Sequence, residues 1–140
     1  GRYFVRAWLP PGVEEVVFRG AIFSALLSSM QCKWGAICIS AALFALIHFN
    51  PAQTPHAFLM GLLMGWLYMR TGSIVPGVVF HWANNTVAYL IAVAYPGDET
   101  KLVDIFGGNE TAVILSVVFS LCIFIPALFQ LNIWTKKRGR

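Results

Sequence analysis

Long apolar stretches separated by short polar breaks make up most of this chain. Stretches of this length predict helices that cross a membrane, because a span needs roughly 20 mostly apolar residues. Five of them follow one another, at about residues 12–30, 34–49, 54–71, 74–95 and 111–134. The segment 3–9, which ends at Pro10-Pro11, could be the end of an earlier, sixth membrane helix or an interfacial segment. The pattern therefore predicts an all-α fold, a polytopic transmembrane helix bundle with five to six membrane helices in this chain.

The third stretch carries the clearest boundary signals. Thr54 is the expected N-cap, Pro55 takes the first helical position, and Gly72 follows the last turn. Within the stretch, Gly61 and Gly65 form a GxxxG pattern, which in membrane helices indicates close packing. We therefore expect a second helix to approach this one along the two glycines.

The composition agrees with a membrane protein. The 140 residues are 58% hydrophobic and only 11% charged, whereas soluble domains have about 25% charged residues. The three cysteines show no CxxC spacing, and an odd number cannot close a disulfide framework. Membrane lipids are thus the expected surroundings, and residues 1–140 are interpreted as a single membrane-embedded domain.

The net charge of +4 is concentrated at the ends of the chain. Because Lys and Arg are enriched in cytoplasmic segments, the basic tail at residues 136–140 predicts a multi-pass protein with a cytoplasmic C terminus. No basic face with interleaved aromatic residues accompanies this tail, so no nucleic-acid partner is expected.

The first apolar stretch contains three charged residues, Glu14, Glu15 and Arg19. Ionisable groups inside a membrane are costly, and they usually mark a functional site. Glu15 and Arg19 are four residues apart, so they share a helix face and can form an ion pair. Glu14 lies about 100° further around the helix, which leaves it free to point into a cavity and take part in chemistry.

Two more pairs of residues have the same four-residue spacing. Phe44 and His48 end the second stretch, and His81 and Asn85 lie on one face of the fourth. Glu14, His48 and His81 could coordinate a divalent metal such as zinc and leave positions for water. Without a metal, a glutamate and a histidine could activate water, while a histidine and an amide stabilise an oxyanion. Both alternatives indicate hydrolysis of an acyl bond.

These motifs resemble those of the CPBP family, which contains CAAX prenyl proteases of the Ras-converting type and bacteriocin-processing "Abi" relatives. The family motifs EExxxR, FxxxH and HxxxN are similar to Glu14–Arg19, Phe44–His48 and His81–Asn85, and the similarity covers residues 11–90. The resemblance implies that Glu14 and His48 activate water and that His81 and Asn85 bind the oxyanion. It also implies supporting roles for Glu15, Arg19 and Phe44.

The resemblance further implies an intramembrane endopeptidase that acts on a membrane-associated or prenylated (CaaX-type) peptide or protein. It leaves open whether the enzyme is glutamate-dependent or metal-dependent. The family fold is a bundle of about eight membrane helices, so further helices are expected upstream of Gly1. Two other classes stay open from the residues themselves, a non-enzymatic immunity or scaffold protein and a proton-relay transporter using Glu14, His48 and His81.

One geometric condition applies to the single-site interpretation. Glu14 begins its helix and His48 ends the next, whereas His81 lies seven residues into a helix that enters from the opposite side, roughly 10 Å deep. If Glu14 were more than about 8 Å from both histidines, neither a direct nor a one-water contact could form. The three residues must therefore meet inside the bundle.

Overall fold

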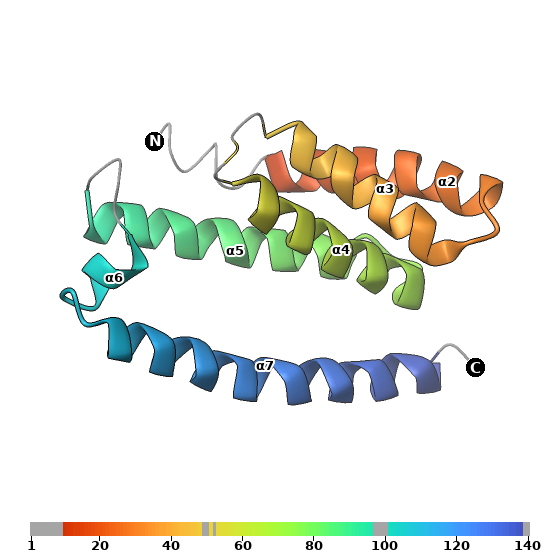
Figure 1. The fold of residues 1–140 in the computed structure, drawn as a ribbon. Helices are drawn as coiled ribbons and strands as arrows, with labels where there is room; N and C mark the ends of the chain where they lie inside the picture. The colour runs from red at the N-terminus through yellow and green to blue at the C-terminus, as the bar shows by residue number, and fades with distance from the viewer. Residues whose placement is uncertain (1–9, 49–50, 52, 97–100, 139–140) are drawn as a thin grey trace. The chain divides into compact units, whose positions relative to one another are not determined.

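The structure is a computed structural model that describes residues 10–48, 51, 53–96 and 101–138. Every regular element in these ranges is helical, which confirms the all-α prediction (Figure 1). The chain divides into two compact units, with residues up to Val87 in the first and residues from Ala88 onward in the second. The predicted site residues all belong to the first unit.

The first described helix is continuous from residue 10 to residue 29, but its middle is wider than an α-helix. Residues 10–15 are α-helical, η1 (Val16–Phe23) is π-helical, and α2 (Ser24–Ser29) returns to α geometry. The junction residues Glu15 and Ser24 keep helical backbone angles, so the axis is unbroken. The helix predicted at 12–30 is therefore confirmed, while its π-helical segment was not predicted.

The π-helical segment places residues five apart on one face. Phe18 and Phe23 are both buried, and Ser24 Oγ donates a 3.0 Å hydrogen bond to the Arg19 carbonyl. The same hydroxyl lies 2.9 Å from Tyr68 Oη, and because its proton is already donated, Tyr68 is the donor. In an α-helix, residues five apart would point about 140° away from each other. The wide turn therefore keeps Phe18 and Phe23 on the same side of the helix, and this side faces the neighbouring helices over a longer stretch.

Two helices, α3 (Lys33–Leu46) and α4 (Thr54–Thr71), pack closely along the predicted glycines (Figure 1). A Cβ atom on Gly61 would lie 2.8 Å from Ala41 Cα, and one on Gly65 would lie 3.3 Å from Ile37 Cγ2. The expectation of close packing at the GxxxG pattern is confirmed.

The predicted helix ends need two corrections. Gln53, not Thr54, is the N-cap of α4, because Thr54 already belongs to the helix and Pro55 fits within the first turn. The second helix ends at Leu46 in place of residue 49, because the His48 amide bonds the Ala45 carbonyl and tightens the last turn. Gly72 ends α4 as predicted, with φ +66°.

The first unit has two apolar clusters that hold these helices together. One surrounds the ring of Phe44, and the other surrounds Phe23 and Ile37. The buried members of the first are Phe18, Phe44, Ala45, Ala57, Met60 and Met64. Three of the predicted polar site residues, Arg19, His48 and His81, contact Phe44 in this first cluster.

The helix α5 (Val75–Ala94) carries the last predicted motif, and its only buried residues are Gly77 and His81. Beyond it lie the short α6 (Leu102–Ile105) and the long α7 (Glu110–Arg138), which extends further than the predicted 111–134. Among the described residues, two helices are long and apolar enough to cross a membrane, Val75–Ala94 and Glu110–Lys136.

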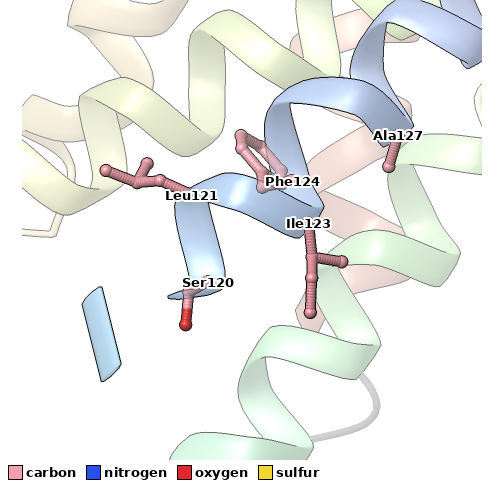
Figure 2. Close-up of a pocket in the computed structure, with 5 residues that line it drawn as sticks. All are labelled: Ser120, Leu121, Ile123, Phe124 and Ala127. Carbon is pink, nitrogen blue, oxygen red and sulfur yellow. The ribbon is translucent and has the colours of Figure 1, made fainter. Parts of the chain in front are cut away.

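A surface hollow on α7 carries no chemistry of its own. Figure 2 shows its lining residues, all from this one helix: Ser120, Leu121, Ile123, Phe124 and Ala127. Ser120 is the only polar side chain among them, and its hydroxyl donates to the Ser116 carbonyl at 2.7 Å. The hollow is an apolar surface feature suited to lipid contact.

Candidate active site

The predicted ion pair between Glu15 and Arg19 is present and buried. Arg19 Nη1 donates to Glu15 Oε1 at 2.9 Å, and the two side chains are 1% and 0% exposed. Arg19 Nη2 donates to the Gly61 carbonyl at 3.0 Å. A single guanidinium therefore fixes the Glu15 carboxylate and ties the first helix to α4.

His81 lies between the two glutamates. Its Nε2 is 3.8 Å from Glu14 Oε2, and its Nδ1 is 3.7 Å from Glu15 Oε1. The His81 side chain is 5% exposed and that of Glu14 is 28% exposed, so Glu14 alone of the two acids reaches outward. The separation of Glu14 from His81 is well inside the limit set above, so this part of the geometric condition is met.

The Phe44 ring is the shared neighbour of most site residues. It meets the rings of Phe18, His48 and His81 edge-on, at centroid separations of 5.4, 4.9 and 5.6 Å. The Arg19 Cζ atom lies 4.9 Å from its centroid, in cation–π range. The Phe44 ring is therefore in contact with both imidazoles and with the guanidinium.

His48 lies in the turn that follows α3. Its Nδ1 is 2.9 Å from the Phe44 carbonyl, and since a carbonyl only accepts, Nδ1 carries the proton. In the neutral ring, Nε2 is then the basic nitrogen. Between described residues, no hydrogen bond or ion pair joins His48 to Glu14 or His81.

Asn85 lies one turn beyond His81 on α5 and is half-buried. It shares a face of α5 with His81, and no hydrogen bond joins its amide to another residue in the part of the chain that the structure describes. The Oδ1 atom of its neighbour Asn84 accepts a 3.1 Å hydrogen bond from His56 Nε2, because an amide oxygen only accepts.

The metal interpretation finds no assembled ligand set in the described part of the chain. No three His, Cys, Asp or Glu side chains there are grouped so that they could hold an ion. Glu14 and His81 approach each other, whereas His48 is in contact with Phe44 and makes no described contact with either of them.

Buried polar atoms without a protein partner concentrate at this site. They are Glu14 Oε2, Glu15 Oε2, Arg19 Nε and His81 Nδ1, and outside the site only Ser40 Oγ joins them among the described residues. Buried polar groups are normally hydrogen-bonded. Several buried polar atoms without a partner in one place are therefore typical of a binding or catalytic site.

An apolar groove adjoins the site. It has a volume of about 480 Å³, within the range of roughly 300–1,000 Å³ typical of ligand pockets. Its lining consists of Phe18, Ile22, Leu43, Leu46, Ile47 and Thr54. Phe18 links the groove to Phe44, and through that ring to both histidines.

Some site contacts were not predicted from the sequence. One is the hydrogen bond from His56 to Asn84, beside the HxxxN motif. Gly77 and the Gly61 carbonyl contact the ion pair, and no spacing rule points to them. The GxxxG pattern indicated close packing at Gly61 but not that its carbonyl would receive Arg19.

The fold and site together define a helical membrane protein with a buried acid–arginine–histidine cluster beside an apolar groove. The chain belongs to the type II CAAX prenyl endopeptidase Rce1-like family, whose model matches residues 2–87. No curated protein and no solved structure gives a significant match. Family membership implies a membrane-embedded protease, and for the family it implies prenylated protein substrates.

Proposed function

We propose that the protein is an intramembrane endopeptidase that hydrolyses a peptide bond near the prenylated, CaaX-type C terminus of its substrate. The observation that carries this proposal is the position of His81 between Glu14 and Glu15, with the Phe44 ring in contact with both His81 and His48. In this proposal an acid, a base and an oxyanion donor from three helices act at one place.

Glu14 and His48 activate the attacking water. Glu14 is the more exposed acid, and it is not paired with Arg19, so its carboxylate can accept a proton. His48 offers Nε2, because its Nδ1 proton is engaged by the Phe44 carbonyl. The water oxygen attacks the scissile carbonyl carbon while its proton passes to one of these groups.

His81 and Asn85 stabilise the oxyanion that forms. Both lie on the same face of α5, one helical turn apart, and each can donate an N–H to a developing negative charge. The C–N bond then breaks, and the proton taken from water is returned to the leaving amine. Glu15 and Arg19 hold the cluster in place through their buried ion pair.

The groove beside Phe18 binds the isoprenoid chain. Five of its six lining side chains are purely hydrocarbon, and burial of apolar surface contributes about 25 cal/mol per Å². A prenyl group lying there would place the adjoining peptide next to Phe44 and the two histidines. We also propose that the protein has five to six membrane helices and that its C-terminal tail lies in the cytoplasm.

The test is cleavage of a farnesylated CaaX peptide by the purified protein in detergent or vesicles, compared with the same peptide without its lipid. We expect cleavage of the farnesylated peptide only, and its loss in Glu14→Gln and His48→Ala. Glu110→Gln, which changes an exposed acid at the start of α7, is the matched control.

Two outcomes would contradict the proposal. One is equal cleavage by wild type and Glu14→Gln, and the other is a folded wild type that cleaves neither peptide. A parallel series with a chelator addresses the metal alternative, because loss of cleavage that zinc restores would show that Glu14, His48 and His81 act around an ion.

A further inference from the structure

Within the site, the Glu15 carboxylate lies very close to Gly77, a residue that has no side chain. A Cβ atom built on Gly77 would lie 2.7 Å from Glu15 Oε2 and 3.4 Å from Glu15 Cδ. The first distance is shorter than any normal contact between a carbon and an oxygen atom. Glycine is therefore the only residue that lets α5 lie against this carboxylate in the observed arrangement.

Gly77 and His81 are four residues apart and are the only buried residues of α5. A Cβ atom on the first would lie 2.7 Å from Glu15 Oε2, and the second approaches Glu15 Oε1 with Nδ1 at 3.7 Å. One helical turn of α5 therefore lies close to both oxygens of the Glu15 carboxylate, and Arg19 binds Oε1 as well.

The carboxylate has little freedom to move away from α5. Its Oε1 atom is bound by Arg19, whose second nitrogen is bound by the Gly61 carbonyl of α4. An added methyl group at residue 77 would therefore displace α5 and carry His81 with it. The groove would change less, because none of its lining residues comes from α5.

We propose that Gly77 is a positioning residue, which sets the distance of His81 from both glutamates by letting α5 lie directly on the Glu15 carboxylate. This inference rests on the proposed endopeptidase function. Gly77 touches neither substrate nor reacting atoms, and it acts through Glu15 and His81. It predicts that a larger residue at position 77 lowers kcat and leaves KM for the prenylated peptide nearly unchanged.

The experiment compares Gly77→Ala with Gly20→Ala. A methyl group on Gly20 would meet only Val16 Cγ1, at 4.0 Å, so this second variant adds the same atoms to a helix without a clash. We expect Gly77→Ala to lower kcat by about 100-fold, since a misplacement near 1 Å can cost that much. KM should stay within about twofold, and Gly20→Ala should match wild type in both constants.

A second change tests the size argument and covers the case in which Gly77→Ala does not fold. Glu15→Asp withdraws the carboxylate by about 1.5 Å, the length of one carbon–carbon bond. In the Gly77→Ala background it should therefore restore activity, or folding, relative to Gly77→Ala alone. A double variant as poor as the product of the two single changes would overturn the proposal.

A readout without activity separates this inference from the proposed function. The chain has three histidines, so the imidazole ¹⁵N signals can be resolved by NMR and that of His81 assigned with His81→Gln. At fixed pH, Gly77→Ala should shift the His81 signal and leave that of His48, in the turn after α3, in place. The His56 ring bonds Asn84 of α5, so its signal follows α5 and is not used as a control. If wild type does not cleave but this shift is seen, only the proposed function fails. An unchanged His81 signal together with a wild-type kcat would overturn the positioning role.

Discussion

Arg19 Nη2 donates a 3.0 Å hydrogen bond to the carbonyl of Gly61, a residue 42 positions further along the chain. The same guanidinium pairs with Glu15 and lies over the Phe44 ring. One side chain, 1% exposed, therefore connects the first helix, α3 and α4 at the edge of the site. Because Arg19 makes all three contacts, replacing it tests how much these contacts stabilise the fold.

Replacement of Arg19 by methionine should destabilise the protein strongly. The change leaves the buried Glu15 carboxylate without its partner, and breaking a buried pair costs about 3–5 kcal/mol. Removing both charges in Glu15→Gln/Arg19→Met should cost clearly less than Arg19→Met alone. Reversible unfolding in mixed micelles measures both, and equal losses in the two variants would show that the charge pairing contributes little.

Alanine at Gly61 should separate α3 from α4. Its methyl group would lie 2.8 Å from Ala41 Cα, a backbone atom that cannot move alone. Overpacking of this kind costs about 1–3 kcal/mol. Gly65→Ala is the control, because its methyl group would meet only the Ile37 side chain, at 3.3 Å. In a thermal shift assay, the melting temperature of Gly61→Ala should be lower than that of Gly65→Ala. The reverse order would contradict the close packing of α3 and α4 at Gly61.

Loss of the Tyr68 hydroxyl should weaken the π-helical segment. Tyr68→Phe removes the 2.9 Å hydrogen bond to Ser24 Oγ, and a single hydrogen bond contributes about 1 kcal/mol. Adding Ser24→Ala should cost less in this background than in wild type, since the two groups share that bond. Tyr89→Phe, at an exposed tyrosine of α5, should leave the melting temperature unchanged. Full additivity would mean that the Ser24–Tyr68 bond has no role in solution.

A tryptophan at Leu43 should fill the apolar groove and weaken binding of the prenyl chain. Leu43 lines the groove, whereas Ile39, one turn earlier on α3, is also exposed but lies outside it. We expect Leu43→Trp to raise KM by about tenfold, equivalent to 1.4 kcal/mol, with kcat preserved. Ile39→Trp should behave as wild type. Equal KM values for the two variants would place the prenyl chain elsewhere.

The features that the sequence predicted well are those that a local spacing pattern marks, either within one helix or on the surface of one helix. The apolar stretches predicted the helices, and the four-residue spacing of Glu15 and Arg19 predicted their ion pair. The small-residue pattern at Gly61 and Gly65 predicted close packing, which the structure confirms. The family resemblance stated from the three motifs is confirmed by the family match over residues 2–87.

Features that depend on two helices were harder to predict. Nothing in the spacing of Gly77 shows that a carboxylate from another helix will lie on it, because this depends on how α5 docks. The hydrogen bond from His56 to Asn84 likewise depends on how α5 docks against α4. The roles of Glu14, His48, His81 and Asn85 remain predictions, and the direct approach of His48 to Glu14 is not among the described contacts.

The π-helical segment has a consequence for insertions and deletions. Phe18 and Arg19 face the site, while Phe23 and Ser24 pack against Tyr68. The wide turn keeps both groups in contact with their partners although five residues separate them. Removing one residue after Arg19 would leave the EExxxR motif intact and bring Phe18 and Phe23 four residues apart, the spacing that an α-helix places on one face. An α-helical turn could then replace the wide turn without turning α2 away from α4. With the present number of residues, α-helical geometry in this segment would instead turn α2 by about 100°, so the contacts with Tyr68 depend on the π-helical geometry.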